Sequence, residues 1–323
     1  LDGFRFDLMG MIDIETMKAV RAELDKIDPT IFVYGEGWAA GAPVIPNEEC
    51  AMKANAYKIP GVAVFSDDLR DGVKGHFSQA TGRGFATGAE GCEESVKFGV
   101  VGAIEHPQIN YDLVNYSKAP YTNHPTQVIN YVSCHDDMCL TDKLRASMPD
   151  ADEKALQRYA RLAQTIVFTS QGVPFMFTGE EIFRDKKGVH NSYCSPDEIN
   201  AIDWSLKRSN REQFDYYRNL IQLRKSHPAF RLATAEEVRE HLQFIENTPA
   251  QVVAYTLKGN AGGDEWSEIV VAFNGGSEAA EIEIPEGNWM VIANDGQIDL
   301  AGSVKIEGSK ATIAHSSALI LAR

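Results

Sequence analysis

Over roughly the first two thirds of the chain, short apolar runs alternate with stretches whose apolar residues recur every three or four positions. The short runs predict strands and the periodic stretches predict helices, because these spacings place apolar side chains on one side of each element. Strands are expected at 1–6, 30–38, 61–68, 126–133 and 172–179, and helices at 13–27, 152–169 and 210–225. Strands that alternate with helices indicate a parallel sheet built from βα units.

The pattern changes after about residue 232. Six short strand-like runs with turn residues between them follow, and one of them, AAEIEI at 279–284, alternates apolar and acidic residues. Such alternation is typical of an antiparallel strand with one buried face and one face in water. We therefore expect two domains, an α/β domain at residues 1–232 and an antiparallel β-sandwich at 233–323. The Gly-rich stretch 79–95 is expected to be a loop.

The charge balance narrows the classes of partner. Lys and Arg number 31 against 46 Asp and Glu, which gives a net charge of −15. Binding to nucleic acid or to an anionic membrane requires a basic face, so we expect neither as the main partner. No apolar run approaches the roughly 20 residues that a membrane-spanning helix needs. The five cysteines are scattered and predict no disulfide framework, and no second Cys pair supports a zinc site at Cys134 and Cys139.

Charged side chains stand where three of the expected strands end. Arg5 and Asp7 close the first strand, and Glu36 follows the second. His135 and Asp136 follow the fourth. Each group alone is compatible with a structural role, such as a salt-bridged carboxylate or a buried histidine. The carboxyl ends of parallel strands meet at one edge of a sheet, where (β/α) barrels carry their active sites, so the three groups together predict an active site.

Carboxyl groups in this arrangement suit cleavage of a glycosidic bond, which needs one ionised and one protonated carboxyl group. Residues two apart in a strand point the same way, so Arg5 lies beside Asp7 and is expected to lower the pKa of its carboxyl group. Glu36 follows an apolar strand and precedes Trp38, and such surroundings raise the pKa of a carboxyl group towards that of a general acid. We expect the Arg5–Asp7 pair to be buried, because the Asp7 carboxylate would act as the nucleophile inside the site.

Several segments carry a family resemblance. DGFRFD (2–7), GEGW (35–38) and YVSCHDD (131–137) resemble characteristic segments of the α-amylase superfamily of retaining glycoside hydrolases, in that superfamily's order. FRFDLMG, VAVFSDDLRDGVKG and NSYCSPDEINAIDW are more similar to the type I pullulanases, which cleave α-1,6 branch points. The resemblance covers about residues 1–230. The expected β-sandwich fits that family's C-terminal domain.

The resemblance assigns roles to the residues at the strand ends. It implies that Asp7 is the nucleophile, Glu36 the general acid/base and Asp136 the stabiliser of the transition state. It also implies that Arg5 and His135 contact the nucleophile and hydroxyl groups of the sugar in the cleaved position.

The same resemblance places further residues around the bound sugar. Trp38 is expected to stack its ring on the sugar on the leaving-group side. Asn191 and Tyr193, after the eighth barrel strand, are expected to border the cleft. The resemblance implies no required cofactor, and the sequence neither indicates nor rules out a structural calcium ion.

The segment around His135 departs from the family pattern. Asp137 stands where Asn is usual, and Ser133 and Cys134 stand where an acidic residue and Ser are common. A second carboxylate beside Asp136 is expected to raise the pKa of one of the two, because like charges at close range disfavour joint ionisation. No expected catalytic group is lost, so these changes bear on specificity and not on the reaction.

Three functions remain in view. The favoured one is a retaining hydrolase of α-1,6-glucosidic branch links in pullulan, glycogen or starch-derived α-glucans. The second is an enzyme of the same superfamily that acts on α-1,4 links, by hydrolysis or by transglycosylation. The third is a catalytically silent homologue that binds glycans, and the presence of all three expected carboxyl groups weighs against it.

The resemblance also predicts an incomplete (β/α)8 barrel. Residues 1–232 supply five strands of eight, which by the resemblance are the fourth to the eighth. An open parallel sheet of this kind exposes two unpaired edges and one apolar face. We therefore expect this chain to be the C-terminal part of a larger enzyme. Its missing N-terminal part is expected as a partner that pairs with residues 1–7 and 173–178, or else a neighbouring copy covers the sheet.

Overall fold

The computed structural model describes all residues from 1 to 323 and contains two sheets. Five strands form a parallel sheet in the order β1-β2-β3-β4-β5. Their bounds are β1 (Gly3–Phe6), β2 (Phe32–Gly35), β3 (Val62–Phe65), β4 (Val128–Asn130) and β5 (Val173–Pro174). All five expected strands are therefore present, each shorter than the apolar run that predicted it.

The three helices expected from apolar periodicity are present as well. They are α1 (Ile14–Asp25), α5 (Glu153–Thr169) and α8 (Arg211–Ser226). The start of α1 shows why the helix begins where it does, since the Asp13 carboxylate accepts a hydrogen bond from the backbone N–H of Thr16 at 2.7 Å. No helix combines the length and the apolar character that crossing a membrane requires.

Six shorter helices have no apolar periodicity that predicts them. They are α2 (Asp67–Lys74), α3 (Glu93–Val100), α4 (Leu140–Ser147), α6 (Asp197–Asn200), α7 (Leu206–Ser209) and α9 (Ala235–His241). Seven of the eight residues of α2 are buried, and these include Asp68, Arg70 and Asp71. Only Leu69 and Val73 of α2 are large apolar residues, so the helix is too short and too highly charged for its burial to be predicted from apolar spacing. The Gly-rich loop expected at 79–95 is interrupted by a 3-10 turn at Phe85–Thr87 and ends at Cys92, because α3 begins at Glu93.

The two faces of the parallel sheet differ. One face carries Val33, Val64 and Val128, which join the main hydrophobic core together with residues of α2, α3 and α5. The other face carries a separate cluster, in which Phe65 and Tyr131 are buried. Every member of this second cluster comes from the strands or from residues close to their ends, so this face has no helical layer within the chain.

β1 and β5 are the two edges of the parallel sheet. β5 is only two residues long and ends at Pro174, which has no N–H to donate to a neighbouring strand. The expected pairing of these edges with another polypeptide stays a prediction, because the structure describes a single chain.

The rest of the strands form an antiparallel sheet. Its order is β10-β9-β12-β8-β7-β6, and β11 pairs with β9. The bounds are β6 (Leu242–Phe244), β7 (Val252–Lys258), β8 (Glu268–Asn274), β9 (Ala280–Asn294), β10 (Gln297–Ile298), β11 (Val304–Ile313) and β12 (Ser317–Ala322). Two of the six strand-like runs expected after residue 232, at 279–287 and 289–295, are one strand, since β9 runs through both. β11 pairs along nearly all of β9, and a shift in register between Gly308 and Lys310 accommodates the turn-like residues in the middle.

The expected β-sandwich takes the form of one continuously hydrogen-bonded sheet with apolar residues on both faces. Val253 and Tyr255 of β7 belong to the main core, which the helices share. Their neighbours Val252 and Ala254 point the other way, into a second cluster with Trp289 of β9. The long antiparallel pair of β9 and β11 therefore encloses the second cluster and takes the place of a separate second sheet.

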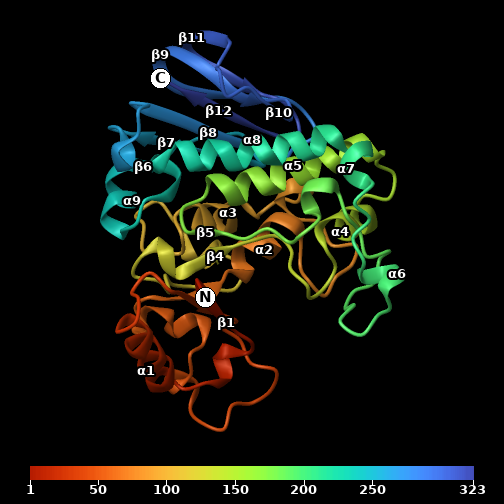
Figure 1. Ribbon diagram of the computed structural model, residues 1–323. Helices are drawn as coiled ribbons and strands as arrows, with labels where there is room; N and C mark the ends of the chain where they lie inside the picture. The colour runs from red at the N-terminus through yellow and green to blue at the C-terminus, as the bar shows by residue number, and fades with distance from the viewer.

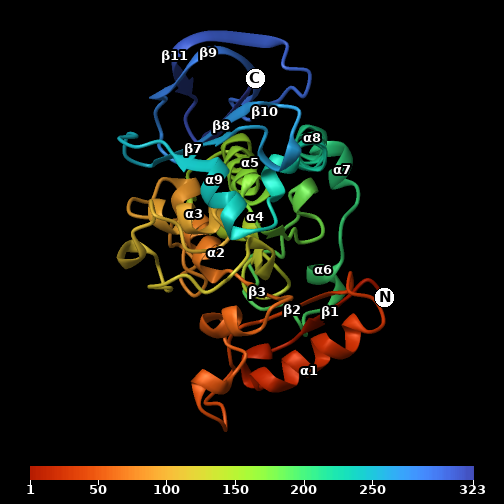
Figure 2. The ribbon, with the colours of Figure 1, turned by 90° about the vertical axis from the view of Figure 1, so that its left-hand side faces the viewer.

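α5 and α8 lie between the antiparallel sheet and the rest of the molecule (Figures 1 and 2). Polar contacts join the layers. The Tyr255 hydroxyl of β7 donates to the carbonyl of Thr169 at the end of α5, at 2.7 Å. Arg161 of α5 donates to the carbonyl of Gly296 at 2.9 Å. The two sheets thus share one set of helices.

Gly99→Ala tests the close approach of α2 and α3. A Cβ at Gly99 would lie 2.9 Å from the Cβ of the buried Leu69, which belongs to α2. Alanine favours an isolated helix by about 1 kcal/mol over glycine, but we expect overpacking to dominate and to lower the free energy of unfolding by about 1–3 kcal/mol. Urea denaturation measures this change. Gly41→Ala, where an added Cβ meets nothing within 4 Å, is the control. An unchanged midpoint for Gly99→Ala would contradict the tight contact.

Candidate active site

The residues expected to form a site lie beyond the carboxyl ends of neighbouring parallel strands. Arg5 is in β1 and Asp7 follows that strand directly, while Glu36 is the first residue after β2. His135 and Asp136 lie in the segment between β4 and α4. Parallel strands end at one edge of the sheet, so the fold brings the three groups together as the sequence predicts.

Arg5 connects the two carboxyl groups of the first two strands. Its Nη1 donates to Oδ1 of Asp7 at 2.7 Å, and its Nη2 donates to Oε1 of Glu36 at 2.5 Å. The other Glu36 oxygen accepts a hydrogen bond from the backbone N–H of Leu8 at 3.0 Å. Leu8 has left-handed backbone geometry, with a φ of 44°. The guanidinium is therefore shared by both carboxylates and does not serve Asp7 alone.

The expectation that Asp7 is buried is wrong for this chain. The Asp7 side chain is 71% exposed, whereas the Glu36 side chain is only 5% exposed. The reason is the position of the strands, because β1 is an edge of the sheet and nothing in the chain lies beyond it. β2 has a strand on both sides, so the residue that follows it is covered.

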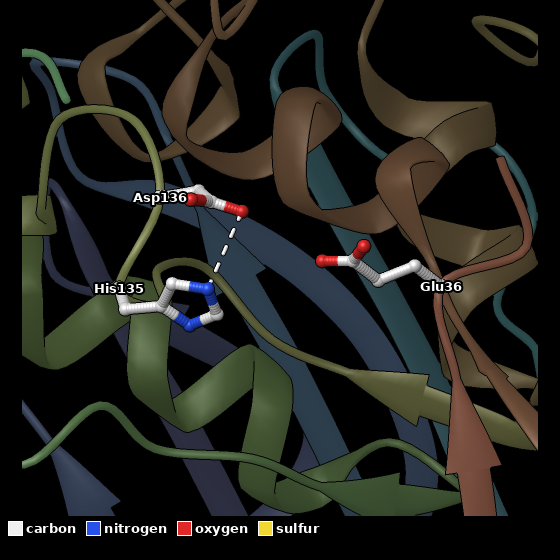
Figure 3. A group of neighbouring side chains, drawn as sticks. All are labelled: Glu36, His135 and Asp136. Carbon is white, nitrogen blue, oxygen red and sulfur yellow. Dashed lines mark ion pairs between the residues drawn. The ribbon is translucent and has the colours of Figure 1, made fainter. Parts of the chain in front are cut away.

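His135 and Asp136 face Glu36 from the other side of the site (Figure 3). The His135 Nε2 lies 3.5 Å from Oδ2 of Asp136. One nitrogen or oxygen atom from each of Glu36, His135 and Asp136 lies within 4.8 Å of the others. The structure thus gathers two carboxyl groups and an imidazole around one small space, next to the Arg5 guanidinium.

A cavity of about 200 Å³ opens at this place. Its walls combine polar groups expected from the sequence with aromatic rings. The lining residues are Arg5, Tyr34, Glu36, Trp38, Phe65, Tyr131, Cys134, His135 and Phe175. Trp38 therefore lies at the site, as expected, and its ring centroid is 6.3 Å from that of Phe65.

Four aromatic residues of this wall are absent from the residues that the sequence singled out. They are Tyr34, Phe65, Tyr131 and Phe175, and the ring of Phe65 packs edge-on against the other three at 4.9 to 5.7 Å. Strand alternation carries a signal for one of them, since Tyr34 stands two residues before Glu36 and shares its face. The others become neighbours only through the pairing of β2 to β5.

Asn191 and Tyr193 do not line the cavity. Both are exposed, Tyr193 to 80%. Their neighbour His190 does approach the site, since its Nε2 lies 3.6 Å from Oδ1 of Asp137. The loop that the sequence places at the cleft therefore borders the segment after β4 through His190, while the two expected residues point into solvent.

Beneath the segment after β4 lies a buried carboxyl group that the sequence analysis missed. Glu180 accepts hydrogen bonds from the Ser133 hydroxyl, from Nε2 of Gln164 at 2.7 Å and from the backbone N–H of Phe177 at 3.1 Å. Burial raises the pKa of Glu180 to about 7. Ser133 stands where the family resemblance suggests an acidic residue, and its hydroxyl donates where a carboxylate would repel Glu180.

Glu36, His135 and Asp136 also form a set of donors that a divalent cation can bind. The surroundings favour a different use of Glu36. Both of its oxygens already accept hydrogen bonds, and the cationic Arg5 lies against one of them. A metal ion at this carboxylate would be repelled by the cationic guanidinium, whereas a neutral hydrogen-bond donor would not.

Comparison with known proteins connects this geometry to one family. The family model for the all-beta domain of pullulanase matches residues 238–297. The pullulanase of Bacillus subtilis (strain 168) is 37% identical over 285 residues, which are 88% of this chain and 38% of that protein. This chain belongs to the pullulanase family.

Solved pullulanase structures share the fold of the whole chain. The pullulanase from Bacillus acidopullulyticus superposes with a TM-score of 0.92 at 37% identity and covers 100% of this chain. A pullulanase from Paenibacillus barengoltzii, in complex with maltohexaose and alpha-cyclodextrin, gives a TM-score of 0.88 at 42% identity over 100% of this chain. This chain spans 38% and 48% of the lengths of those two chains.

The raised pKa of Glu180 predicts a pH dependence of stability. The native state holds the proton up to about pH 7, while the unfolded chain releases it near the ordinary value of 4.5. The unfolded state therefore binds fewer protons between these values, and this group makes stability fall as pH rises from about 4.5 to about 7. The fall is at most roughly 3 kcal/mol.

Urea denaturation at a series of pH values measures this effect. We expect Glu180→Gln to flatten the decline between pH 4.5 and 7 relative to the unmodified chain. The neighbouring half-buried Glu181 provides the control, because Glu181→Gln changes the same charge one residue away and leaves Glu180 in place. Equal slopes for Glu180→Gln and the unmodified chain would contradict the prediction.

Proposed function

We propose that this chain supplies the catalytic carboxyl groups of a retaining hydrolase that cleaves α-1,6-glucosidic links in pullulan, glycogen or starch-derived α-glucans. The observation that carries the proposal is the shared guanidinium, which holds the carboxylates of Asp7 and Glu36 on its two nitrogens. Retaining glycosidases have their two carboxyl groups about 5–5.5 Å apart. Two carboxylates bound to one guanidinium suit this close spacing, whereas an inverting enzyme needs room for a water molecule between them.

The first half-reaction transfers the sugar to the protein. Asp7 attacks the anomeric carbon while the bond from that carbon to the glycosidic oxygen breaks, and the Glu36 carboxyl proton passes to the departing oxygen. The products are a free glucan end with a hydroxyl group and a glycosyl ester on Asp7. Asp136 and His135, across the site from Glu36, bind hydroxyl groups of the sugar ring as positive charge develops on it.

The second half-reaction releases the sugar. Glu36 now acts as a base and takes a proton from a water molecule, whose oxygen attacks the anomeric carbon and frees Asp7. The structure suits this step, because the Glu36 carboxylate is held by donors on both oxygens. Two displacements at one carbon retain its configuration, and the chemistry uses only side chains and water.

The substrate class is supported by the cavity and by the relatives. The cavity combines aromatic rings with a few polar groups, which is the composition of a site that binds sugar rings on their C–H faces. The Paenibacillus barengoltzii pullulanase structure holds maltohexaose and alpha-cyclodextrin, and another from Anoxybacillus holds maltotetraose. We extend α-glucan binding to this chain on that basis. No observation favours α-1,4 cleavage or a silent glycan-binding role.

The proposal includes a closed (β/α)8 barrel. β1 and β5 are unpaired edges, and the aromatic face of the parallel sheet has no helical layer in the chain. A further polypeptide of the same enzyme that adds three βα units would pair with both edges and turn the aromatic face into the barrel interior. It would also cover Asp7, which β1 leaves exposed. The greater length of the relatives supports this partner.

Substitution of the two carboxyl groups tests the reaction. In the enzyme that carries this chain, we expect Asp7→Asn and Glu36→Gln each to lower kcat on pullulan by about three orders of magnitude or more, since each removes a group that makes or breaks a bond. Linkage analysis should show loss of α-1,6 links and release of maltotriose, and NMR of fresh product should show retained configuration. Glu15→Gln, an exposed carboxylate on α1, is the control. Inverted product, or a wild-type rate in either variant, would contradict the assignment.

Trp38→Ala tests the sugar-stacking wall. We expect KM for pullulan to rise by about two- to tenfold, because loss of one stacking ring removes about 0.5–1.5 kcal/mol of binding. The melting temperature should change little, since Trp38 is only partly buried. Trp204→Ala is a matched control, because Trp204 is 60% exposed and does not line the cavity. Parallel losses of melting temperature and activity in Trp38→Ala would indicate a packing role instead.

A further inference from the structure

The segment that carries His135 and Asp136 lies outside the backbone ladders of the fold. It connects β4 to α4, and no residue from 131 to 138 takes part in a backbone–backbone hydrogen bond. Asp137, in its middle, has a φ of 57°, a left-handed conformation that Asp adopts more readily than most residues but at a cost relative to glycine. Such a segment keeps one conformation only if surrounding groups hold it.

Two lysine side chains supply that support. Lys186 Nζ donates to the carbonyl of His135 at 3.1 Å and to the carbonyl of Asp137 at 2.8 Å. Lys74 Nζ, at the C-terminal end of α2, donates to the carbonyl of Met138 at 3.1 Å. Three carbonyl groups of one short segment are therefore held by two cations from distant parts of the chain.

Both lysines are buried, Lys74 to 2% and Lys186 to 1% residual exposure. All the hydrogen bonds of their ammonium groups go to carbonyl oxygens and none to a carboxylate. Burial lowers the pKa of Lys74, which reflects the free-energy cost of keeping an ammonium group away from water. A methionine would fill similar space without that cost, so the contacts with the carbonyls are what the charged groups add.

Lys186 is itself held in place. Its backbone N–H donates to Oδ2 of Asp142 on α4 at 2.6 Å, and the N–H of Gly188 donates to the other oxygen of the same carboxylate at 2.8 Å. Asp142 is also buried. The ammonium group of Lys186 therefore approaches the segment from a fixed backbone, which lets it define the position of the two carbonyls.

We propose that Lys186 and Lys74 are positioning residues that fix the segment 135–138 and thereby the directions of the His135 and Asp136 side chains. The proposal rests on the function proposed above in one respect, namely that Asp136 and His135 bind the sugar during cleavage. Lys186 has the larger effect, since its two carbonyl partners lie on either side of Asp136. Lys74 holds the end of the segment, where α4 begins.

Lys143 provides a matched control within the same chain. It is 1% exposed, and its ammonium group also donates only to carbonyls, those of His76 at 3.0 Å and of Gln79. Those carbonyls belong to a different loop, after α2. Lys143→Met removes an equally buried ammonium group, so it measures the general effect of such a loss on stability.

The experiment compares Lys186→Met, Lys74→Met and Lys143→Met in the enzyme that carries this chain. We expect Lys186→Met to lower kcat on pullulan by about 100-fold, as misplacement of a reacting group by about 1 Å can do, while KM changes much less. Lys74→Met should have a smaller effect in the same direction, and Lys143→Met should leave kcat near the unmodified value. Lys186→Arg, which can still donate to both carbonyls, should recover much of the rate.

The NMR signals of the His135 imidazole provide a readout that does not require activity. They are identified by their loss in His135→Gln, and we expect Lys186→Met, but not Lys143→Met, to shift or broaden them. Unchanged His135 signals and kcat in Lys186→Met would overturn the proposal, as would equal losses of kcat in Lys186→Met and Lys143→Met. If Lys186→Met does not fold, the kcat and the His135 signals of Lys186→Gln and Lys186→Arg are compared with those of Lys143→Met in the same way. If the unmodified enzyme does not cleave pullulan, the proposed function fails, and the imidazole signals alone still decide the positioning role.

Discussion

The hydrogen bonds from Arg5 to Asp7 and Glu36 depend on the register of a single pair of short strands. β1 and β2 are parallel, with Arg5 opposite Tyr34 and Phe6 opposite Gly35. This register places Glu36 one step beyond Phe6, within reach of the guanidinium and of the Leu8 N–H. A slip of one residue would turn Arg5 to the opposite face of the sheet. Four residues of strand pairing therefore set the relative position of the two carboxyl groups.

The region beneath the site is polar to an unusual degree for a protein interior. Lys74, Lys186 and Glu180 are all buried. Each contacts the segment that carries His135 and Asp136, and Glu180 does so through the buried Ser133 hydroxyl. Each has hydrogen-bond partners, and most of these partners are backbone carbonyls or neutral side chains. A satisfied polar network of this kind fixes directions that apolar packing leaves free, because hydrogen bonds depend on angle as well as distance.

The sequence predicts the elements that have a strong period and the polar groups that end them. Glu36 and His135 were found because each follows an apolar run. The helix α5 was found because its apolar residues recur at helical spacing over a long stretch. Asp7 was expected to be buried because its role as nucleophile was considered in a complete site, whereas within this chain β1 is a sheet edge that leaves the side chain uncovered. Lys186 was missed because its contact with His135 joins residues 51 positions apart and follows no local pattern. The break expected within β9 failed because pairing with β11 outweighs the local turn preference of Pro285 and Gly287.

The position of α5 has a consequence for folding. From Ala160 to Thr169 every residue of this helix is buried, including Arg161 and Gln164. One side of the helix meets the core of the parallel sheet and the other meets β-strands of the antiparallel sheet. Removal of either sheet would strip α5 of half its cover and leave buried polar groups without partners. The antiparallel sheet is therefore an integral wall of the α/β part of the chain, and we expect the two parts to unfold as one cooperative unit.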